Sequence, residues 1–516
     1  MKVTEAYCRA LIQRFEPDLE QLPGYMSISG FRELLLSPTQ DIFNYEHRTV
    51  HQDMTQPLSH YYISSSHNTY LTQGQLMGES SIEGYIRALL RGCRCLELDA
   101  WDGPDDEPVI YHGYTFTTKI LFRDVIMAIK TNAFKSSQYP VILSIENHCS
   151  VEQQNKMAKH LVNILGDYLY CTPVGEDESV LPSPHSLARK ILIKEESPSK
   201  GRKFTKENPE ASEEQLEEEE KREEELMENK TLCVYASEST NRLSLVQKSN
   251  SFKLDKDFSD LVTYVKAVRF CGFEKAKCWK FYEMASLSET QAQYQINSAE
   301  KKFVEHTTKY LSRIYPKGLR TGSSNFSPLP FWNVGCQLVA LNYQTFDKYL
   351  YLYEAKFALN GNCGYVLKPH FLRDGSFDPS NLVENRYKKT LTVMVISGQH
   401  IPKPGEATVG EIVDPYVSIK VCGHPVDSNK KKTSVVKNNG FFPVWNETLT
   451  FDVQMPDLAV VVFTVKDESI TGRNFRLGRY ALPFNSITEG YRHIHLVDDY
   501  HSVIVSATLF VHVTIE

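Results

Sequence analysis

Short runs of hydrophobic residues alternate with helical patterns over much of the chain. One helical face is formed by Ile82, Tyr85, Ile86, Leu89 and Leu90. Runs of the length of buried strands lie at residues 61–65, 93–99, 109–111, 141–145 and 191–193, and again at 261–265, 311–315 and 337–342. Because alternation of strands with helices is typical of parallel sheets and barrels, we predict one α/β barrel built from both groups.

A segment without this pattern separates the two groups of strands. Residues 207–228 contain twelve Glu against only Lys221 and Arg222, a net charge of −10 in a chain whose total is −7. Such charge density cannot bury a core and indicates a solvated linker, placed at residues 196–257. We expect this linker to hang near the active face and to be repelled by anionic membranes, which restrains activity; a passive tether is the alternative.

The pattern changes to a period of two near residue 387. Segments of strand length lie at residues 391–396, 416–421, 448–453, 460–465, 493–497 and 508–515, separated by Gly, Pro and Asn. This spacing predicts an antiparallel β-sandwich over residues 387–516. Residues 1–50 are predicted to be helical and contain no calcium-binding loop of the EF-hand pattern.

Composition and charge exclude several classes of protein. The net charge of −7 argues against a protein that coats nucleic acid, and no run approaches the 18 apolar residues of a membrane span. The first residues lack the layout of a secretory signal, and eleven cysteines in 516 residues are no disulfide framework, so we expect the reducing cytosol. Cys93 and Cys95 are interpreted as packing residues because no second cysteine pair supports a zinc site.

Polar residues gather at the ends of the predicted strands of the first half. They are His67, Asn68, Glu97, Asp99, His112 and Glu146. The carboxyl ends of parallel strands open onto one face of a barrel, where active sites lie. Carboxylate and amide oxygens there predict a Ca²⁺ site, and two histidines beside it suit metal-assisted phosphoryl chemistry. The alternative is that these are ordinary strand-end residues.

Long motifs on both sides of the acidic segment carry a family resemblance. The first half contains SSSHNTYL (64–71), GCRCLELD (92–99), WDG (101–103), YHG (111–113) and SIENHC (144–149). The second contains FSDLVTYV (258–265), RIYP (313–316), SSN (323–325) and NCGYVLKP (362–369). These resemble the X and Y halves of eukaryotic phosphoinositide-specific phospholipase C, and the C-terminal segment resembles its C2 domain.

The resemblance implies a multidomain chain with α/β and all-β parts. The expected fold is a split TIM-like (β/α)8 barrel, with its X half at residues 51–195 and its Y half at residues 258–374. A C2 β-sandwich would follow at residues 387–516, and an EF-hand-like helical remnant would precede the barrel at residues 1–50. We expect no pleckstrin-homology domain within residues 1–50, as in a natural short form or an incomplete delta-type product. Its acidic insert favours a delta-like member, with the zeta class as the sibling interpretation.

The resemblance also implies a reaction. The expected function is calcium-dependent hydrolysis of phosphatidylinositol 4,5-bisphosphate to diacylglycerol and inositol 1,4,5-trisphosphate. The inositol 2-hydroxyl attacks, Glu97 or Glu146 takes its proton, and water opens the cyclic phosphodiester. His67 steadies the phosphate and His112 protonates the diacylglycerol oxygen. The implied Ca²⁺ ligands are Asn68, Glu97, Asp99 and Glu146.

Further residues are assigned to the lipid by the same resemblance. Implied headgroup contacts are Lys194, Ser286, Arg313 and Tyr315, and an implied apolar rim facing the membrane consists of Leu76, Tyr114 and Phe116; buried packing is the alternative for the rim. Glu196 stands where the family usually has a second lysine, so one phosphate donor is lost and a repulsive charge is added. We therefore expect weaker selectivity for the 4,5-bisphosphate. Leu319 replaces a rim aromatic residue and keeps an apolar surface.

The C2 segment is expected to bind calcium weakly. Asp414, Asn438 and Asp467 match calcium-loop positions, but Ser469 and Phe475 replace carboxylates. The lysines at residues 430–432 are predicted to lie on a loop. They either contact anionic headgroups or are only solvated.

Phosphoinositide lipids and anionic membrane surfaces are the expected partners, without nucleic acid. We expect a monomeric, cytoplasmic protein that is peripheral at membranes. Two other functions remain open: a catalytically inactive lipid-binding scaffold of the same family, and a glycerophosphodiesterase on a related barrel.

Overall fold

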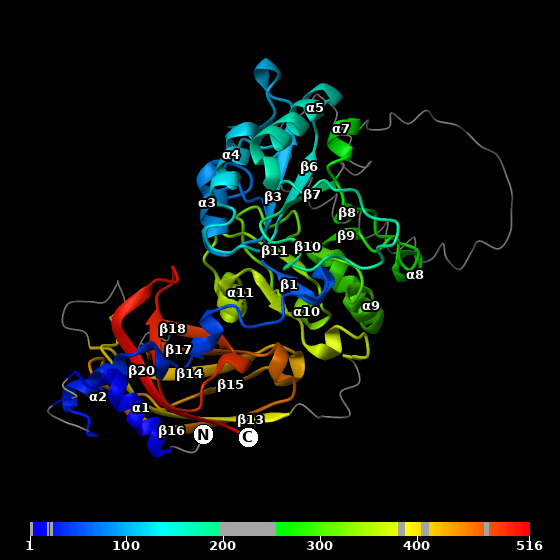
Figure 1. Cartoon of the computed structure of the whole chain (residues 1–516). Helices are drawn as coiled ribbons and strands as arrows, with labels where there is room; N and C mark the ends of the chain where they lie inside the picture. Colours follow the sequence, from blue (N-terminus) through cyan, green and yellow to red (C-terminus); the bar gives the residue numbers. More distant parts are fainter. Residues whose placement is uncertain are drawn as a thin grey trace. The chain divides into compact units, whose positions relative to one another are not determined.

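The computed structural model describes residues 4–17, 20, 24–196, 254–379, 388–403, 412–468 and 474–516 (Figure 1). The chain forms two compact units. The first, here called the barrel unit, comprises Gln52–Leu350 and Cys363–Ser380; the second, the sandwich unit, comprises Met1–His51, Tyr351–Asn362 and Asn381–Glu516. The acidic residues 207–228 and Ser469 lie outside the described residues, so the predictions made for them are untested.

Eight parallel strands build the barrel unit in the described part of the chain. In pairing order they are β8 (Lys266–Ala267), β9 (Glu283–Ser288), β10 (Ser312–Tyr315), β11 (Leu338–Leu341), β2 (Ser65–Ser66), β3 (Cys95–Trp101), β6 (Val141–Asn147) and β7 (Ile191–Glu196). The two halves of the sequence join where Ala340 pairs with Ser65 and Leu341 with Ser66. The predicted TIM-like barrel, split by an insert, is confirmed.

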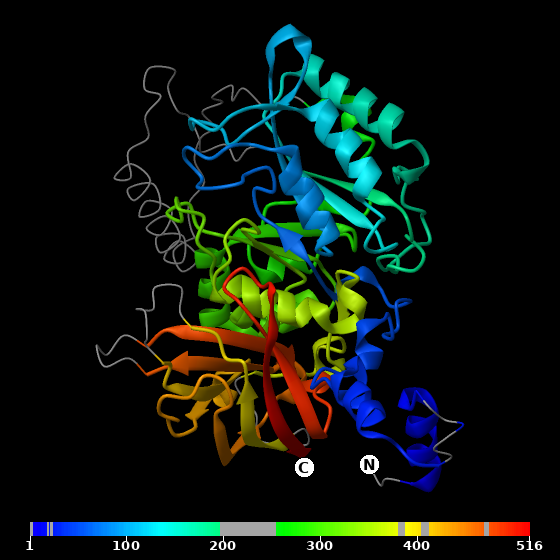
Figure 2. The ribbon, with the colours of Figure 1, turned by 90° about the vertical axis from the view of Figure 1, so that its left-hand side faces the viewer.

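Helices pack along the outside of these strands (Figure 2). They are α3 (Ile82–Leu90), α4 (Phe122–Asn132), α5 (Val151–His160), α7 (Lys256–Ser259), α8 (Phe273–Ala276), α9 (Glu289–Thr307), α10 (Leu329–Asn333) and the first residues of α11 (Lys348–Ala358). Serines begin three of the helices, where Ser81, Ser150 and Ser288 accept hydrogen bonds from first-turn amides. The predicted face of α3 buries Tyr85 and Leu89, whereas Leu90 is exposed.

Two strand predictions in the barrel unit need correction, and a third is wrong. The segment at residues 61–65 divides into β2 and a separate β1 (Tyr61–Ile63), which pairs antiparallel with β12 (Tyr365–Leu367). The prediction at residues 261–265 is wrong, because they are irregular and precede β8; β9 was missed because its sequence mixes polar with apolar residues. The strand predicted at residues 109–111 is present as β4 (Val109–Ile110), but it pairs antiparallel with β3 and β5 (Ile120–Leu121), so His112 follows a hairpin strand instead of a barrel strand.

The sandwich unit contains one antiparallel set of strands. In pairing order they are β15 (Asn429–Lys432), β14 (Pro415–Cys422), β17 (Val460–Asp467), β18 (Arg476–Pro483), β19 (Gly490–Val497), β20 (Val503–Ile515), β13 (Lys389–Gln399) and β16 (Val444–Val453). The alternation along β13 buries Leu391, Val393 and Val395 in the core, as the period of two predicted. The predicted antiparallel β-sandwich is confirmed, although β15 and β18 were missed.

The lysines at residues 430–432 lie on a strand, which corrects their interpretation as a loop. They belong to β15, which is fully exposed and pairs with β14 at the end of the sheet order. Charged lysines on an edge strand discourage pairing with further chains, which gives them a structural role.

The N-terminal segment is helical, as predicted, and belongs to the sandwich unit. It forms α1 (Glu5–Phe15) and α2 (Ile28–Leu36), and Ile42 and Phe43 then enter the sandwich core. In the described residues, no helix has both the length and the apolar character needed to cross a membrane.

Candidate active site

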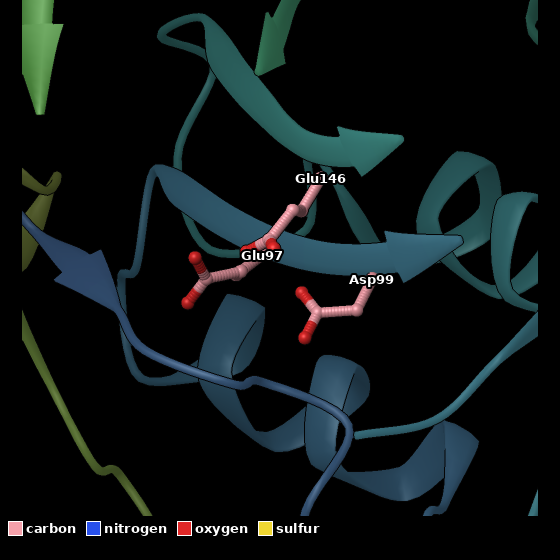
Figure 3. A group of neighbouring side chains, drawn as sticks. All are labelled: Glu97, Asp99 and Glu146. Carbon is pink, nitrogen blue, oxygen red and sulfur yellow. The ribbon is translucent and has the colours of Figure 1, made fainter. Parts of the chain in front are cut away.

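Three carboxylates converge inside the barrel unit (Figure 3). Glu97 and Asp99 are on β3 and Glu146 is on β6, and one ligand oxygen from each lies within 4.8 Å of the others. The cause is local: alternation places Glu97 and Asp99 on one face of β3, and the parallel register sets Asp99 beside Glu146. This is the one group of potential metal ligands found among the described residues.

Asp99 is the least satisfied member of the cluster. It is buried and its Oδ2 accepts a hydrogen bond from Tyr70 Oη at 2.6 Å, but Oδ1 has no hydrogen-bond partner. Burial, together with the charges of Glu146 and Glu97, raises the pKa of Asp99 well above its ordinary value. A buried carboxylate oxygen without a partner is costly, and a bound cation would remove that cost. The donor set therefore fits a hard metal ion.

Glu97 is held between two donors. The backbone N–H of Asn68 donates to Oε2 at 2.8 Å, and Arg313 forms an ion pair with Oε1 at 2.6 Å. Asn68 has a φ of 40°, in the left-handed region that Asn tolerates, and its side-chain amide donates to Gln75 Oε1 at 2.6 Å. Burial alone would lower the pKa of Arg313, but the negative charges around it, Glu97 first, raise it. Arg313 is thus a permanent cation beside the cluster.

Both predicted histidines are oriented by acceptors. His67 Nδ1 lies 3.0 Å from Asn342 Oδ1, and His112 Nδ1 lies 2.8 Å from the carbonyl oxygen of Gln75. An acceptor at Nδ1 places the proton there and leaves Nε2 of a neutral ring as an acceptor. Burial lowers the pKa of His67, which favours the neutral ring.

Two residues that sequence analysis missed connect these histidines. Gln75 Nε2 donates to Asn342 Oδ1 at 3.2 Å and to Ser323 Oγ at 2.9 Å. Gln75, whose carbonyl binds His112, is thus linked to Asn342, which binds His67. Asn342 comes directly after β11, and the strand-end argument used for the first half would have found it. Gln75 lies in a loop and carries no comparable signal.

The predicted headgroup residues gather around one carboxylate. Lys194 Nζ donates to Glu196 Oε2 at 2.6 Å, and Ser286 Oγ donates to the same oxygen at 3.1 Å. The Arg313 guanidinium lies 5.7 Å from the centre of the Tyr315 ring. Burial alone would raise the pKa of Glu196, but the charges of Lys194 and Arg313 lower it. Glu196, which the sequence marked only as a departure, is central to this group.

The predicted rim residues differ in exposure. Phe116 is 70% and Tyr114 50% exposed, whereas Leu76 is half-buried; the Phe116 N–H donates to the Leu76 carbonyl oxygen at 3.0 Å. Met77, next to Leu76, is 79% exposed and was not predicted. Leu319, the predicted rim substitute, is half-buried. An apolar surface is therefore present on two neighbouring loops.

The acidic residues of the sandwich unit are occupied by the protein itself. Asp467 Oδ1 accepts the N–H of Asp414 at 2.7 Å, and Asp414 Oδ1 accepts the N–H of Asn438 at 2.7 Å. Lys437 Nζ pairs with Asp414 Oδ2 at 3.1 Å and with Glu468 Oε2 at 2.9 Å. The backbone carbonyl of Phe475 accepts the N–H of Asp467 at 2.9 Å. These contacts are consistent with weak calcium binding.

Three family models match the chain. They are phosphatidylinositol-specific phospholipase C, X domain, over residues 54–197; phosphatidylinositol-specific phospholipase C, Y domain, over residues 258–371; and the C2 domain over residues 389–498.

Curated relatives and solved structures agree with these matches. The chain is 46% identical over 519 residues to 1-phosphatidylinositol 4,5-bisphosphate phosphodiesterase delta-4 of Xenopus laevis and 45% identical over 518 residues to the delta-1 protein of Homo sapiens; 99% of the chain and 67% of each relative are covered. The crystal structure of S. officinalis PLC21 matches with a TM-score of 0.81 and 36% identity, over 100% of this chain and 63% of that one. The chain thus spans about two thirds of the length of its relatives. It belongs to the phosphatidylinositol-specific phospholipase C family.

Proposed function

We propose that the chain is a calcium-dependent phosphodiesterase that hydrolyses phosphatidylinositol 4,5-bisphosphate to diacylglycerol and inositol 1,4,5-trisphosphate. The observation that carries this proposal is the convergence of Glu97, Asp99 and Glu146, with a buried Asp99 oxygen lacking a partner. The relatives at 45–46% identity carry the name of this activity. An inactive scaffold is less well supported, because the carboxylates and both histidines are all present.

The residues that would hold the ion are Asn68, Glu97, Asp99 and Glu146. Their oxygens suit Ca²⁺, which prefers several carboxylate and carbonyl ligands in a flexible arrangement. When bound, such an ion would supply positive charge that lowers the pKa of a neighbouring hydroxyl, here the inositol 2-hydroxyl.

The chain's own residues handle the protons and the phosphate. Glu97 or Glu146 takes the proton of the attacking hydroxyl, because both carboxylates lie at the cluster. His67, fixed at Nδ1 by Asn342, stabilises the phosphate oxygens by donating from Nε2, which requires the doubly protonated ring when the phosphate is bound. His112, fixed at Nδ1 by Gln75, gives a proton from Nε2 to the departing diacylglycerol oxygen and must therefore be doubly protonated at that moment.

The remaining assignments concern the membrane and the division of the chain. We assign catalysis to residues 51–195 and 258–374, and lipid contact to Phe116, Tyr114, Leu76 and the C2 segment at residues 387–516. The protein would act as a monomer, peripheral at anionic membranes of the cytoplasm. At the level of class, the delta type fits best, since the relatives named above are delta-4 and delta-1.

A calcium titration of hydrolysis on vesicles tests the activity. Wild-type protein should release inositol 1,4,5-trisphosphate from vesicles containing the bisphosphate, and a chelator should abolish the release. His67→Ala should lower the rate by at least about 100-fold, within the range for a lost donor that stabilises developing charge. The matched control is His185→Ala, an exposed histidine of the same unit. Hydrolysis by His67→Ala at the wild-type rate would contradict the assignment.

A further inference from the structure

The barrel interior carries two levels of in-register polar residues on three neighbouring strands. On β3, β6 and β7, Glu97, Ser144 and Lys194 form one level. Two residues farther along each strand, Asp99, Glu146 and Glu196 form the next level, which is entirely acidic. Because residues two apart share a face of a strand, Lys194 and Glu196 lie on the same side of β7.

Glu196 differs in its contacts from Asp99 and Glu146, the other two acidic residues of its level. Asp99 and Glu146 belong to the potential metal cluster, and Glu196 does not. Its Oε2 instead accepts hydrogen bonds from Lys194 Nζ at 2.6 Å and from Ser286 Oγ at 3.1 Å. Lys194 is fully buried and also donates to Ser144 Oγ at 3.1 Å. Lys194, the one cation among the six residues of these two levels, thus donates to a carboxylate of the chain itself.

The Glu196 carboxylate accepts hydrogen bonds from Lys194 and Ser286. It therefore uses the same donors that a phosphate group of a ligand would need. A ring phosphate that approached Lys194 and Ser286 would have to displace Glu196 and then remain close to its negative charge. Charge-assisted hydrogen bonds are about twice as strong as neutral ones, so this competition is substantial. Arg313 on β10, which is paired with Glu97, is a second buried cation at the site.

We propose that Glu196 is a specificity-determining residue that competes with ring phosphates for Lys194 and Ser286. The inference rests on the proposed function and concerns its substrate class. The chain discriminates less between phosphatidylinositol 4,5-bisphosphate and inositol lipids with fewer ring phosphates than the same site would without this carboxylate. Removing the charge while keeping the side-chain shape restores that discrimination.

The Glu196→Gln variant tests this competition. The kcat/KM for the bisphosphate divided by that for unphosphorylated phosphatidylinositol should rise by about tenfold, the scale of one lost charge-assisted contact. Most of the change should appear in KM for the bisphosphate, because the contact concerns binding of the ring. Vesicles should contain one inositol lipid at a time, with total surface charge equalised by phosphatidylserine.

Glu195→Gln is the matched control. Glu195 is the preceding residue of the same strand, so its side chain points to the opposite face, while the change in net charge is identical. Its ratio should stay at the wild-type value. If the ratio of kcat/KM values in Glu196→Gln stays at the wild-type value or falls below it, the proposal is overturned.

Binding of soluble headgroups separates failure of this inference from failure of the proposed activity. Calorimetry on the full chain should show that Glu196→Gln binds inositol 1,4,5-trisphosphate about tenfold more tightly than wild type does, with little change for inositol 1-phosphate. If no inositol lipid is hydrolysed but this difference appears, the activity is wrong and the role of Glu196 stands. If lipids are hydrolysed and trisphosphate binding does not change, the role of Glu196 is wrong. Thermal unfolding of both variants near the wild-type midpoint shows that they are folded.

Discussion

Among the described residues, both units gather carboxylates near the ends of strands, but only the barrel unit leaves a buried carboxylate oxygen without a hydrogen-bond partner. In the barrel unit, Asp99 keeps an oxygen without a hydrogen-bond partner. In the sandwich unit, Asp414 and Asp467 accept backbone N–H groups, and Lys437 pairs with Asp414. A cation site therefore depends less on the number of carboxylates than on whether the protein's own donors already satisfy them.

The largest expected effect is that of removing a charge from the barrel cluster. Asp99→Asn should lower hydrolysis of the bisphosphate by about 1,000-fold or more, equivalent to about 4 kcal/mol, because the cluster loses a ligand charge. Without calcium, the same variant should unfold at a higher temperature than wild type, since the amide relieves repulsion among three neighbouring carboxylates. Vesicle hydrolysis and thermal unfolding in chelator measure the two effects.

Calcium should then separate the two proteins further. Wild type should gain thermal stability as calcium is added, through binding to the folded state, while Asp99→Asn should gain little. Asp260→Asn, an exposed aspartate of the barrel unit, is the control and should behave like wild type in both measurements. Equal calcium-induced stabilisation of Asp99→Asn and wild type would show that the cluster is not the site.

The second effect concerns the ion pairs that surround each acidic group. Arg313→Met should lower the free energy of unfolding by about 3 kcal/mol, because it leaves Glu97 buried and unpaired. Urea denaturation in chelator measures the change. Adding Glu97→Gln should recover much of the loss, whereas two additive losses would contradict coupling between Arg313 and Glu97. Lys437→Met should have little effect in the same measurement, since its partners are reached by solvent.

The sequence predicted the barrel cluster well for a physical reason. Alternation along a strand and the shared direction of parallel strand ends are local rules, and together they bring Glu97, Asp99 and Glu146 to one place. The period of two in the sandwich unit is equally local, and its strands were mostly found. Such predictions need no knowledge of which segments meet.

Most misses at the site depend on the direction in which a strand pairs or on contacts between distant segments. Hydrophobic pattern does not reveal the direction in which β4 pairs, so the position of His112 on a hairpin was not predictable. Gln75 contacts Asn342, 267 residues away, and Ser286 contacts Glu196, 90 residues away. The sequence therefore indicated that Glu196 was unusual, but not that it accepts from Lys194.

A smaller effect compares one buried lysine from each unit. Burial lowers the pKa of Lys368 in the barrel unit and of Lys356 in the sandwich unit to about 7. The ordinary value of 10.5 applies to the unfolded chain, which therefore binds more protons between pH 7 and 10.5. Each lysine thus contributes stability that is complete above pH 10.5 and is lost as the pH falls towards 7.

Substitution by methionine should remove these slopes one at a time. Between pH 7 and 9, the free energy of unfolding of wild type relative to Lys368→Met should rise by at most about 1.4 kcal/mol per pH unit, and the same holds for Lys356→Met. Urea denaturation at several pH values gives the difference. If the free energies of unfolding of wild type and a variant change with pH in parallel, the lysine in question stays protonated in the folded protein. Such a result in one variant alone would show which unit solvates its buried amine.

The smallest expected effect would make the carboxylates of the sandwich unit available to an ion, as those of the barrel unit are expected to be. Lys437→Met removes the cation that pairs with both Asp414 and Glu468, so these carboxylates become available to an added ion. Calorimetric titration of the full chain with calcium should show a second, weak binding event, severalfold tighter than any sandwich binding in wild type. Lys388→Met is the matched control, because Lys388 pairs with the exposed Asp452 away from these acidic residues. If Lys437→Met and Lys388→Met titrate alike, the lost carboxylates at positions 469 and 475 limit calcium binding, and occupation of the remaining ones by Lys437 does not.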